Sequence, residues 1–351
     1  LNLFLNRVMG LPMPIMTFAL SALSVGIIWI GTNQVDAGTM QIGDMMAFLQ
    51  YATEILMSFM IIAMIFIMVP RSSVSANRIF EILETEPTIH DPVEPKHLPK
   101  ENAPITFDHV SFKYANAEEN VLEDIHFTAN PEETVAFIGS TGSGKTTLVN
   151  LLPRFFDITE GTIRFGDIDI RDVSQKELRD RIGYVPQKGI LFSGTIASNL
   201  RYADESLSDE KMEEALSVSQ AREFVDRMPN GVNEPIAQGG TNVSGGQKQR
   251  LSIARALAKD AQVYIFDDTF SALDYATDAK LRAALAELIT KKHATVFIVA
   301  QRISSIMHAD KIIVLDQGKM AGIGTHEELL KSCEVYQEIA HSQLSREELG
   351  E

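Results

Sequence analysis

Two long apolar stretches with almost no charge constrain this chain more than any other feature of its sequence. Residues 11–30 contain no charged side chain, and residues 45–69 contain one, Glu54. A helix rises about 1.5 Å per residue, so twenty residues span the roughly 30 Å hydrocarbon core of a bilayer. Both stretches are therefore predicted to be transmembrane helices, with a lipid bilayer as their partner. Buried core helices of a soluble protein are the alternative, although such helices rarely avoid polar residues on every side.

The charges that flank these stretches predict their orientation. Residues 32–44 carry only acidic charges, whereas Arg7, Arg71 and Arg78 lie at the opposite ends. Basic residues near membrane helices are retained in the cytoplasm, so the short connection is expected outside and everything after residue 70 inside. The expected location is the cytoplasmic membrane. Glu54 is open to two interpretations, a substrate cavity or a structural role through snorkelling or a hydrogen bond between helices.

The composition changes after residue 83, and this change predicts the domain organisation. Residues 75–83 keep apolar side chains at helical spacing, so the second helix is expected to continue through residue 83. Residues 84–104 contain five prolines, which is typical of an extended linker. Residues 105–351 alternate strand-like runs with helical patterns, which predicts a mixed α/β domain with a largely parallel sheet. The expected divisions are thus 1–83, 84–104 and 105–351.

The net charge argues against nucleic-acid binding, and the cysteine content argues against a disulfide. The formal net charge is −16 and falls almost entirely after the first seventy residues. No basic block is present to neutralise a phosphate backbone, so nucleic acid is not an expected partner. Cys333 is the single cysteine and cannot form an intramolecular disulfide, which favours a reducing compartment and a packing role. Because the chain opens with Leu and has no signal-peptide pattern, we expect it to be part of a longer product.

The stretch AFIGSTGSGKTTLVNLL, residues 136–152, carries the clearest chemical signal. It fits the pattern G-x-x-x-x-G-K-[ST], with an apolar strand before it and a helix after it. The glycines let backbone N–H groups surround phosphate oxygens, and the helix N-terminus adds its dipole. This context favours a site for ATP and Mg²⁺ over a merely flexible loop. The expected nucleotide-binding residues are Gly139, Ser140, Thr141, Gly142, Ser143, Gly144, Lys145, Thr146 and Thr147.

Four side chains have distinct expected roles at this site. Lys145 is expected to reach the β and γ phosphates, and the Thr146 hydroxyl is expected to ligate Mg²⁺. Asp267 ends the apolar strand of residues 263–266, where a carboxylate ligand of the metal is needed. Asp268 follows directly and is a candidate catalytic base.

Residues 243–260, VSGGQKQRLSIARALAKD, resemble the signature motif of ATP-binding-cassette (ABC) ATPases. The two glycines open an amphipathic helix whose exposed N–H groups are able to hold a γ-phosphate. A glycine-capped helix is the alternative for the motif by itself. Here the motif lies between a phosphate loop and an acid-ended strand, which is the order found in this family. Its residues are Ser244, Gly245, Gly246 and Gln247.

The resemblance covers the whole chain and implies further roles. Tyr114 matches the aromatic residue that stacks on adenine, Gln187 matches the glutamine that contacts Mg²⁺ and the membrane domain, and Asp274 lies in the loop that crosses the dimer interface. Residues 1–83 look like the last two helices of an ABC exporter half-transporter, so four earlier spans are expected to precede them. The implied fold is an α/β P-loop ATPase domain with a mixed sheet and a helical subdomain, preceded by an all-α transmembrane segment. In this family each ATP lies between the phosphate loop of one chain and the signature of another.

Three positions depart from the family pattern. Asp268 stands where active members carry Glu, and the shorter side chain withdraws the carboxylate by about 1.5 Å, a displacement that can cost about 10²-fold in rate. Gln301 stands where a histidine is expected, and an amide cannot carry the charge of an imidazole or relay a proton. Gln238 replaces a Glu that faces the membrane domain. The candidate catalytic residues are thus Lys145, Asp268 and Gln301.

These departures predict one half of a heterodimeric exporter. The chain resembles the degenerate subunit of bacterial multidrug-type ABC exporters, whose partner carries Glu and His at the matching positions. The expected activity is ATP-driven export of a drug-like or lipid substrate. A slowly hydrolysing homodimer and an ATP-binding regulatory subunit are the alternatives. A soluble ABC ATPase is disfavoured because it needs no bilayer-length apolar helices.

Overall fold

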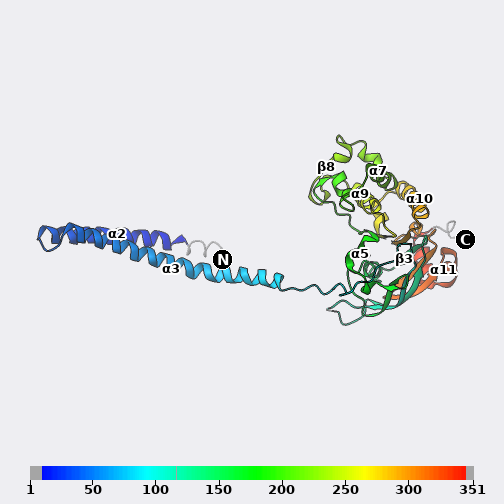
Figure 1. Ribbon diagram of the computed structural model, residues 1–351, viewed down its shortest axis with the longest axis horizontal. Coiled ribbons are helices and arrows are strands. Elements are labelled where there is room, and N and C mark those ends of the chain that lie inside the picture. The colour runs from blue at the N-terminus through cyan, green and yellow to red at the C-terminus, as the bar shows by residue number, and fades with distance from the viewer. Residues whose placement is uncertain (1–9, 116, 345–351) are drawn as a thin grey trace. The chain divides into compact units, whose positions relative to one another are not determined.

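The computed structural model of this chain describes residues 10–115 and 117–344 and divides into two units, Leu1–Thr88 and Ile89–Glu351 (Figure 1). Residues 1–9, which include Arg7, and residues 345–351 lie outside the described part. The ends of the expected divisions 1–83 and 105–351 fall there.

The described part of the first unit consists of two long helices packed against each other, α2 (Pro12–Asp36) and α3 (Ile42–Leu83) (Figure 1). By length and composition each is able to cross a membrane, and none of the apolar window of either helix is buried. α3 runs through Pro70 without interruption to Leu83, which confirms the predicted continuation of the second helix. On α3 the Gln50 amide donates a hydrogen bond to Glu54 Oε1 at 3.0 Å, so this carboxylate has a partner on its own helix.

The second unit is built around a six-stranded sheet in the order β12-β11-β3-β10-β9-β6. All neighbours are parallel except β11 and β12, which pair antiparallel. The expected mixed α/β domain with a largely parallel sheet is therefore confirmed. The strands are β3 (Thr134–Gly139), β6 (Ile182–Val185), β9 (Val263–Asp267), β10 (Thr295–Val299), β11 (Lys311–Asp316) and β12 (Lys319–Gly324).

An antiparallel sheet in the order β2-β1-β4-β5 accompanies the parallel one, and a two-stranded ribbon joins β7 to β8. Before β1, the proline-rich segment contributes Lys96, which forms an isolated bridge with Val173, and Leu98, which is buried. Residues from Ile89 onward thus pack on this unit. The strands are β1 (Ile105–Phe112), β2 (Leu122–Ala129), β4 (Glu160–Phe165), β5 (Ile168–Asp169), β7 (Gly194–Thr195) and β8 (Pro235–Ile236).

Helices cover the parallel sheet and also form a separate helical region. There α6 and α7 pack against α9, and α8 packs against α7. The helices are α4 (Lys145–Leu151), α5 (Gln175–Asp180), α6 (Ile196–Arg201), α7 (Asp209–Val218), α8 (Arg222–Val225), α9 (Gly245–Ala258), α10 (Tyr275–Lys292), α11 (His326–Ser332) and α12 (Glu334–Gln343). Short 3₁₀ turns are η1 (Ile170–Asp172), η2 (Gly231–Asn233), η3 (Gln238–Gly240), η4 (Thr269–Ala272) and η5 (Ile303–Ser305).

Two hydrophobic cores lie on opposite faces of the parallel sheet. Along β3, Val135 and Phe137 belong to the core shared with the antiparallel sheet, whereas Ala136 and Ile138 belong to the core shared with the helical region. Successive strand residues point to opposite faces, so this alternation shows that both faces are covered. Every residue of β9 and β10 is buried, and most polar side chains of these strands lie at the strand ends.

Phe297 of β10 tests the core between the two sheets. Its ring is 1% exposed and lies 5.8 Å from the Phe137 ring and 6.4 Å from the Phe127 ring, between centroids. We expect Phe297→Ala to lower the free energy of unfolding by about 3–5 kcal/mol, because the cavity it leaves cannot close. Urea unfolding of the second unit measures this loss. Phe192→Ala is the control, since that ring is 46% exposed, and a loss of equal size there would contradict the argument.

Candidate functional site

The phosphate-loop sequence forms a tight turn between β3 and α4. Gly142 and Gly144 have φ angles of 86° and 97°, which side chains rarely tolerate. A Cβ on Gly144 would also lie 2.6 Å from Leu122 Cδ2. These two glycines therefore let the backbone curl closely enough to line a pocket with its N–H groups.

Lys145 begins α4, and its side chain folds back over the loop. The ammonium donates hydrogen bonds to the carbonyl oxygens of Gly139 at 2.9 Å and Ser140 at 2.7 Å. Burial lowers the pKa of Lys145, although the carboxylates of Asp268 and Asp267 oppose this change. A buried cation held by loop carbonyls is suited to receive an anion placed inside the loop.

Thr146 and Asp267 meet at the carboxyl edge of the sheet. The Thr146 hydroxyl donates a hydrogen bond to Asp267 Oδ1 at 2.8 Å, and Asp267 is only 2% exposed. Burial raises the pKa of the Asp267 carboxyl, because a charged carboxylate is poorly solvated there. A hydroxyl and a carboxylate in contact are the hard oxygen donors that Mg²⁺ prefers, so these residues fit that ion.

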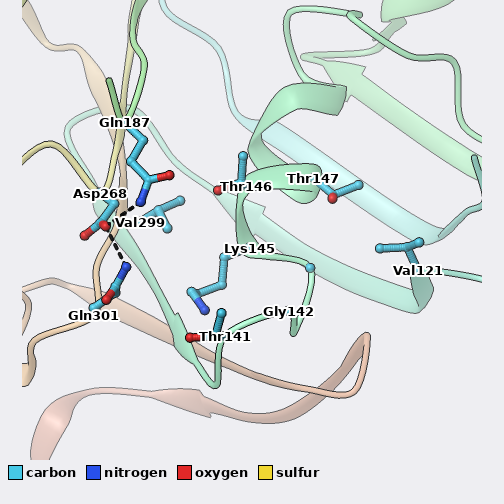
Figure 2. Close-up of a pocket in the computed structure, with 11 residues that line it drawn as sticks. Val121, Thr141, Gly142, Lys145, Thr146, Thr147, Gln187, Asp268, Val299 and Gln301 are labelled. Atoms are coloured by element: carbon cyan, nitrogen blue, oxygen red, sulfur yellow. Dashed lines mark hydrogen bonds between the residues drawn. The ribbon is translucent and has the colours of Figure 1, made fainter. Parts of the chain in front are cut away.

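Asp268 is held between two glutamines from separate loops (Figure 2). Its Oδ2 accepts hydrogen bonds from Gln187 Nε2 at 2.9 Å and from Gln301 Nε2 at 2.6 Å. Its backbone N–H donates to the carbonyl of Val299 at 2.9 Å, and its φ of 46° turns the chain sharply after β9. One carboxylate oxygen is therefore engaged twice, by amides that the sequence places far from each other.

These side chains line a pocket of about 220 Å³ between the loop and the ends of β9 and β10. Figure 2 shows the loop residues on one side and Asp268 with its two glutamines on the other. Sequence reasoning missed the two apolar wall residues, Val121, which directly precedes β2, and Val299, which ends β10. The pocket is lined by Val121, Thr141, Gly142, Gly144, Lys145, Thr146, Thr147, Gln187, Asp268, Val299 and Gln301.

Tyr114 lies close to this pocket but does not line it among the described residues. Its hydroxyl shares a hydrogen bond with Thr147 Oγ1 at 3.1 Å. Its ring packs edge-on against Phe112 and Phe156, with centroids 4.9 and 5.2 Å away. The ring is partly exposed, so an aromatic face lies beside the loop, and its stacking on adenine stays a prediction.

The signature residues form a separate feature of the surface. Ser244 caps α9 and forms a reciprocal pair with Gln247, in which Gln247 Oε1 accepts from the Ser244 N–H at 2.9 Å and Ser244 Oγ accepts from the Gln247 N–H at 3.3 Å. Ser244 and Gly245 are exposed, and neither the signature nor Asp274 lines the pocket within the described ranges. Asp274 instead caps α10 by accepting from the Thr277 N–H at 3.0 Å.

Gln249 is a residue that sequence reasoning missed. It is buried on α9, where its Oε1 accepts from the Gly189 N–H at 3.1 Å and its Nε2 donates to the Pro186 carbonyl at 3.3 Å. Both partners flank Gln187 in the chain, so α9 is tied directly to the loop that supplies Gln187. The available signal was its place four residues before buried Ile253, on the inward face of the helix.

Comparison with known proteins agrees with this geometry. Residues 122–271 match the profile of the family described as ABC transporter. The chain carries an ABC transporter domain. This ABC chain is similar to an uncharacterized ABC transporter ATP-binding protein of Mycobacterium tuberculosis, with 44% identity over 339 residues that cover 95% of this chain and 57% of the relative. The domain that carries the pocket is an ABC ATPase domain.

Two further relatives extend the likeness to exporters. An ATP-dependent lipid A-core flippase of Desulfotalea psychrophila is 38% identical over 318 residues, which cover 91% of this chain and 55% of the flippase. The structure of a bacterial Atm1-family ABC exporter with ATP bound matches with a TM-score of 0.78 and 29% identity, covering 97% of this chain and 60% of that one. The ABC chain therefore spans between half and two thirds of the length of these relatives.

Asp267 allows a test of the electrostatics of the site. Because its pKa is raised in the folded state, the buried charge costs stability at pH values above the unfolded-state pKa of about 3.9. Asp267→Asn removes that charge while its Oδ1 still accepts from Thr146. We expect the variant, without nucleotide or Mg²⁺, to gain about 2–4 °C in Tm at pH 7.5, as about 1 kcal/mol gives in a domain of this size. Thermal unfolding should show the gain shrinking as the pH falls toward 4.

The matched control is Asp274→Asn. Hydrogen bonds from the Thr277 hydroxyl and backbone lower the pKa of Asp274, so its charge stabilises the folded state above the unfolded-state pKa and this contribution is lost as the pH falls. Its replacement should not raise Tm at pH 7.5. A lower Tm for Asp267→Asn at pH 7.5 would contradict the assigned cost of burial.

Proposed function

We propose that this chain is one half of a dimeric exporter that uses ATP to move a substrate across the cytoplasmic membrane. One observation supports this most strongly: a complete phosphate pocket and an exposed signature lie on different parts of the same ATPase domain. Such a domain contributes the phosphate pocket to one nucleotide site and the signature to another. A second domain is needed to complete either site. The two bilayer-length helices in the same chain supply the membrane part of the proposal.

The phosphate pocket is proposed to bind ATP with Mg²⁺. Lys145 exchanges its loop carbonyls for phosphate oxygens, and the N–H groups around Gly142 and Gly144 bind the remaining phosphate charge. Thr146, Asp267 and Gln187 would hold Mg²⁺, which neutralises charge on the phosphates when it is bound. Tyr114 offers its ring to the adenine base. The other proposed nucleotide contacts in the loop are Gly139, Ser140, Thr141, Ser143 and Thr147.

Asp268 is proposed to be a weak base at this site. Its carboxylate is shorter than that of Glu, and its Oδ2 is engaged by Gln187 and Gln301. Gln301 is itself neutral and cannot replace the charge of a histidine. Hydrolysis at this pocket is therefore slow, and ATP bound here has mainly a structural effect on the dimer.

The exposed signature is proposed to complete the hydrolysing site of a different chain. Ser244, Gly245, Gly246 and Gln247 retain the family residues, and the helix start they form is accessible. A partner half-transporter with a full catalytic set would then use this surface across the interface, near Asp274. This proposal explains why the signature is intact in a chain whose own catalytic positions have changed.

The transported substrate is proposed to be an apolar drug-like or lipid molecule. The support comes from the flippase named above, whose name gives a lipid as its substrate.

Gly245 and Asp268 provide a test that separates a heterodimer from a homodimer. A Cβ on Gly245 meets nothing within 4 Å, so Gly245→Asp should fold while placing a like charge against a γ-phosphate. We expect Gly245→Asp to lower ATP turnover of the full-length pair in membranes at least 10-fold, because the competent site uses this signature. Asp268→Asn should change the same turnover less than about 2-fold, since its pocket contributes little hydrolysis.

Two outcomes of this test would contradict the proposal, and one control accompanies them. Equal, large losses for both variants would indicate two equivalent sites and a homodimer. No loss for Gly245→Asp would contradict any role of the signature in hydrolysis. Matching amounts of protein and ATP-dependent thermal stabilisation in both variants exclude misfolding as the cause.

The missing methylene of Asp268 can be restored directly. In a pair whose partner has its own catalytic carboxylate changed to the amide, turnover should fall to background. We expect Asp268→Glu with Gln301→His to restore at least 10-fold over that background, because the carboxylate regains about 1.5 Å of reach and the imidazole returns. Phosphate release measures the rate. Turnover that stays at background would show that these two positions do not limit hydrolysis.

A further inference from the structure

A cluster of metal-ligating side chains lies on the β1–β2 hairpin, outside the nucleotide pocket. His109 of β1 and Asp124 and His126 of β2 each offer one ligand atom, and the three atoms lie within 4.8 Å of one another. All three residues are exposed, and among the described residues none lines the pocket that contains Lys145. The ABC domain therefore has a second group of potential ligands with no assigned role.

Two β-bulges bring these residues to one face of the hairpin. The strand register shifts on either side of Val110. At the first shift, Asp108 and His109 of β1 lie opposite the single β2 residue His126. At the second shift, Glu123 and Asp124 of β2 lie opposite the single β1 residue Ser111. Bulges re-aim side chains and are common beside functional sites. The φ angles of His109 and Asp124, 50° and 54°, mark the two bulged positions.

Contacts within the cluster bring the three ligands together. His109 Nδ1 lies 2.5 Å from Asp124 Oδ1, and the imidazole rings of His109 and His126 stack with centroids 5.4 Å apart. The backbone beneath them is anchored, since the N–H of Asp124 donates to Ser111 Oγ at 3.2 Å and that of His126 donates to Met320 Sδ at 3.3 Å. The three side chains thus contact one another on a backbone that is fixed by its own hydrogen bonds.

The second imidazole distinguishes this cluster from an ordinary surface ion pair. His293 also pairs with a carboxylate, Glu132, and has a φ of 52°. No second histidine accompanies that pair in a ligand cluster within the described part of the chain. Two imidazoles and a carboxylate are the donor set of transition-metal sites, whereas Mg²⁺ prefers oxygen donors alone.

We propose that His109, Asp124 and His126 form a surface site for a divalent transition-metal ion such as Zn²⁺. Ligands about 2.0–2.1 Å from one Zn²⁺ lie roughly 3.3 Å apart in a tetrahedron. The exposed side chains, with His109 and Asp124 at 70% and 63% exposure, reach this spacing by small rotations. Three protein ligands leave a fourth position for water or for a ligand from another molecule.

Zinc titration of the whole chain, untagged and free of nucleotide, tests the site. Isothermal titration with ZnCl₂ should give one saturable site in the wild-type chain, together with a rise in Tm on adding Zn²⁺. His126→Ala should weaken Zn²⁺ binding at least 10-fold because one of three ligands is lost. His293→Ala is the matched control and should bind as the wild type does.

The proposal fails if the wild-type chain binds no Zn²⁺, or if His126→Ala and His293→Ala bind it equally well. His126→Gln provides a second variant if His126→Ala does not fold, because it keeps a polar side chain on the hairpin and removes the imidazole. MgCl₂ in place of ZnCl₂ should give no heat at this site. Mg²⁺ binding that depends on His126 would contradict the assigned metal class.

Discussion

The parallel pairing of β3, β10 and β9 is the constraint on which the rest of this ABC domain depends. Val299 pairs with Phe137 on one side and with Asp267 on the other, so β9 and β10 end at the same level of the sheet and β3 continues two residues further, to Gly139. Parallel strands place their carboxyl ends at one edge, and both faces of this sheet are buried, so the ends are where polar groups can gather. That edge is where the strands lead into the phosphate loop and into Asp267, Asp268 and Gln301.

The buried charges at this edge lower the stability of the folded domain but suit a charged ligand. Lys145 and Asp267 are buried with pKa values moved in opposite directions by the same cause, the poor solvation of charge. Neither charge would be retained there for folding alone, because burying a charge is costly unless a partner compensates. A ligand with phosphate and Mg²⁺ provides that compensation. The energetic signature of the pocket is therefore that of a site prepared for a highly charged ligand.

The sequence predicted those parts of the structure that depend on local pattern and chain order. The glycine loop, the apolar strand before Asp267 and the capped start of α9 each occupy one short stretch, and the mixed α/β fold follows from their alternation. Contacts between distant segments could not be predicted from the sequence. No pattern indicates that two amides bind one oxygen of Asp268, or that Gln249 packs against the loop that carries Gln187. The β1–β2 bulges likewise depend on pairing register, which alternation alone does not reveal.

The helix α9 connects the exposed signature with the loop that carries Gln187. The N-terminal end of α9 is exposed at Ser244 and Gly245, whereas Gln249, little more than one turn later, is buried and holds the loop that carries Gln187. In the proposed dimer, a ligand bound at the exposed end of α9 would act on the same helix that positions Gln187, a wall residue of the chain's own pocket. Two sites connected through one rigid helix influence each other in both directions, because coupling free energies are reciprocal. In the proposed dimer an intact signature beside an altered Asp268 is then not a contradiction, since α9 would respond to a nucleotide held by another chain whatever the rate of hydrolysis in its own pocket.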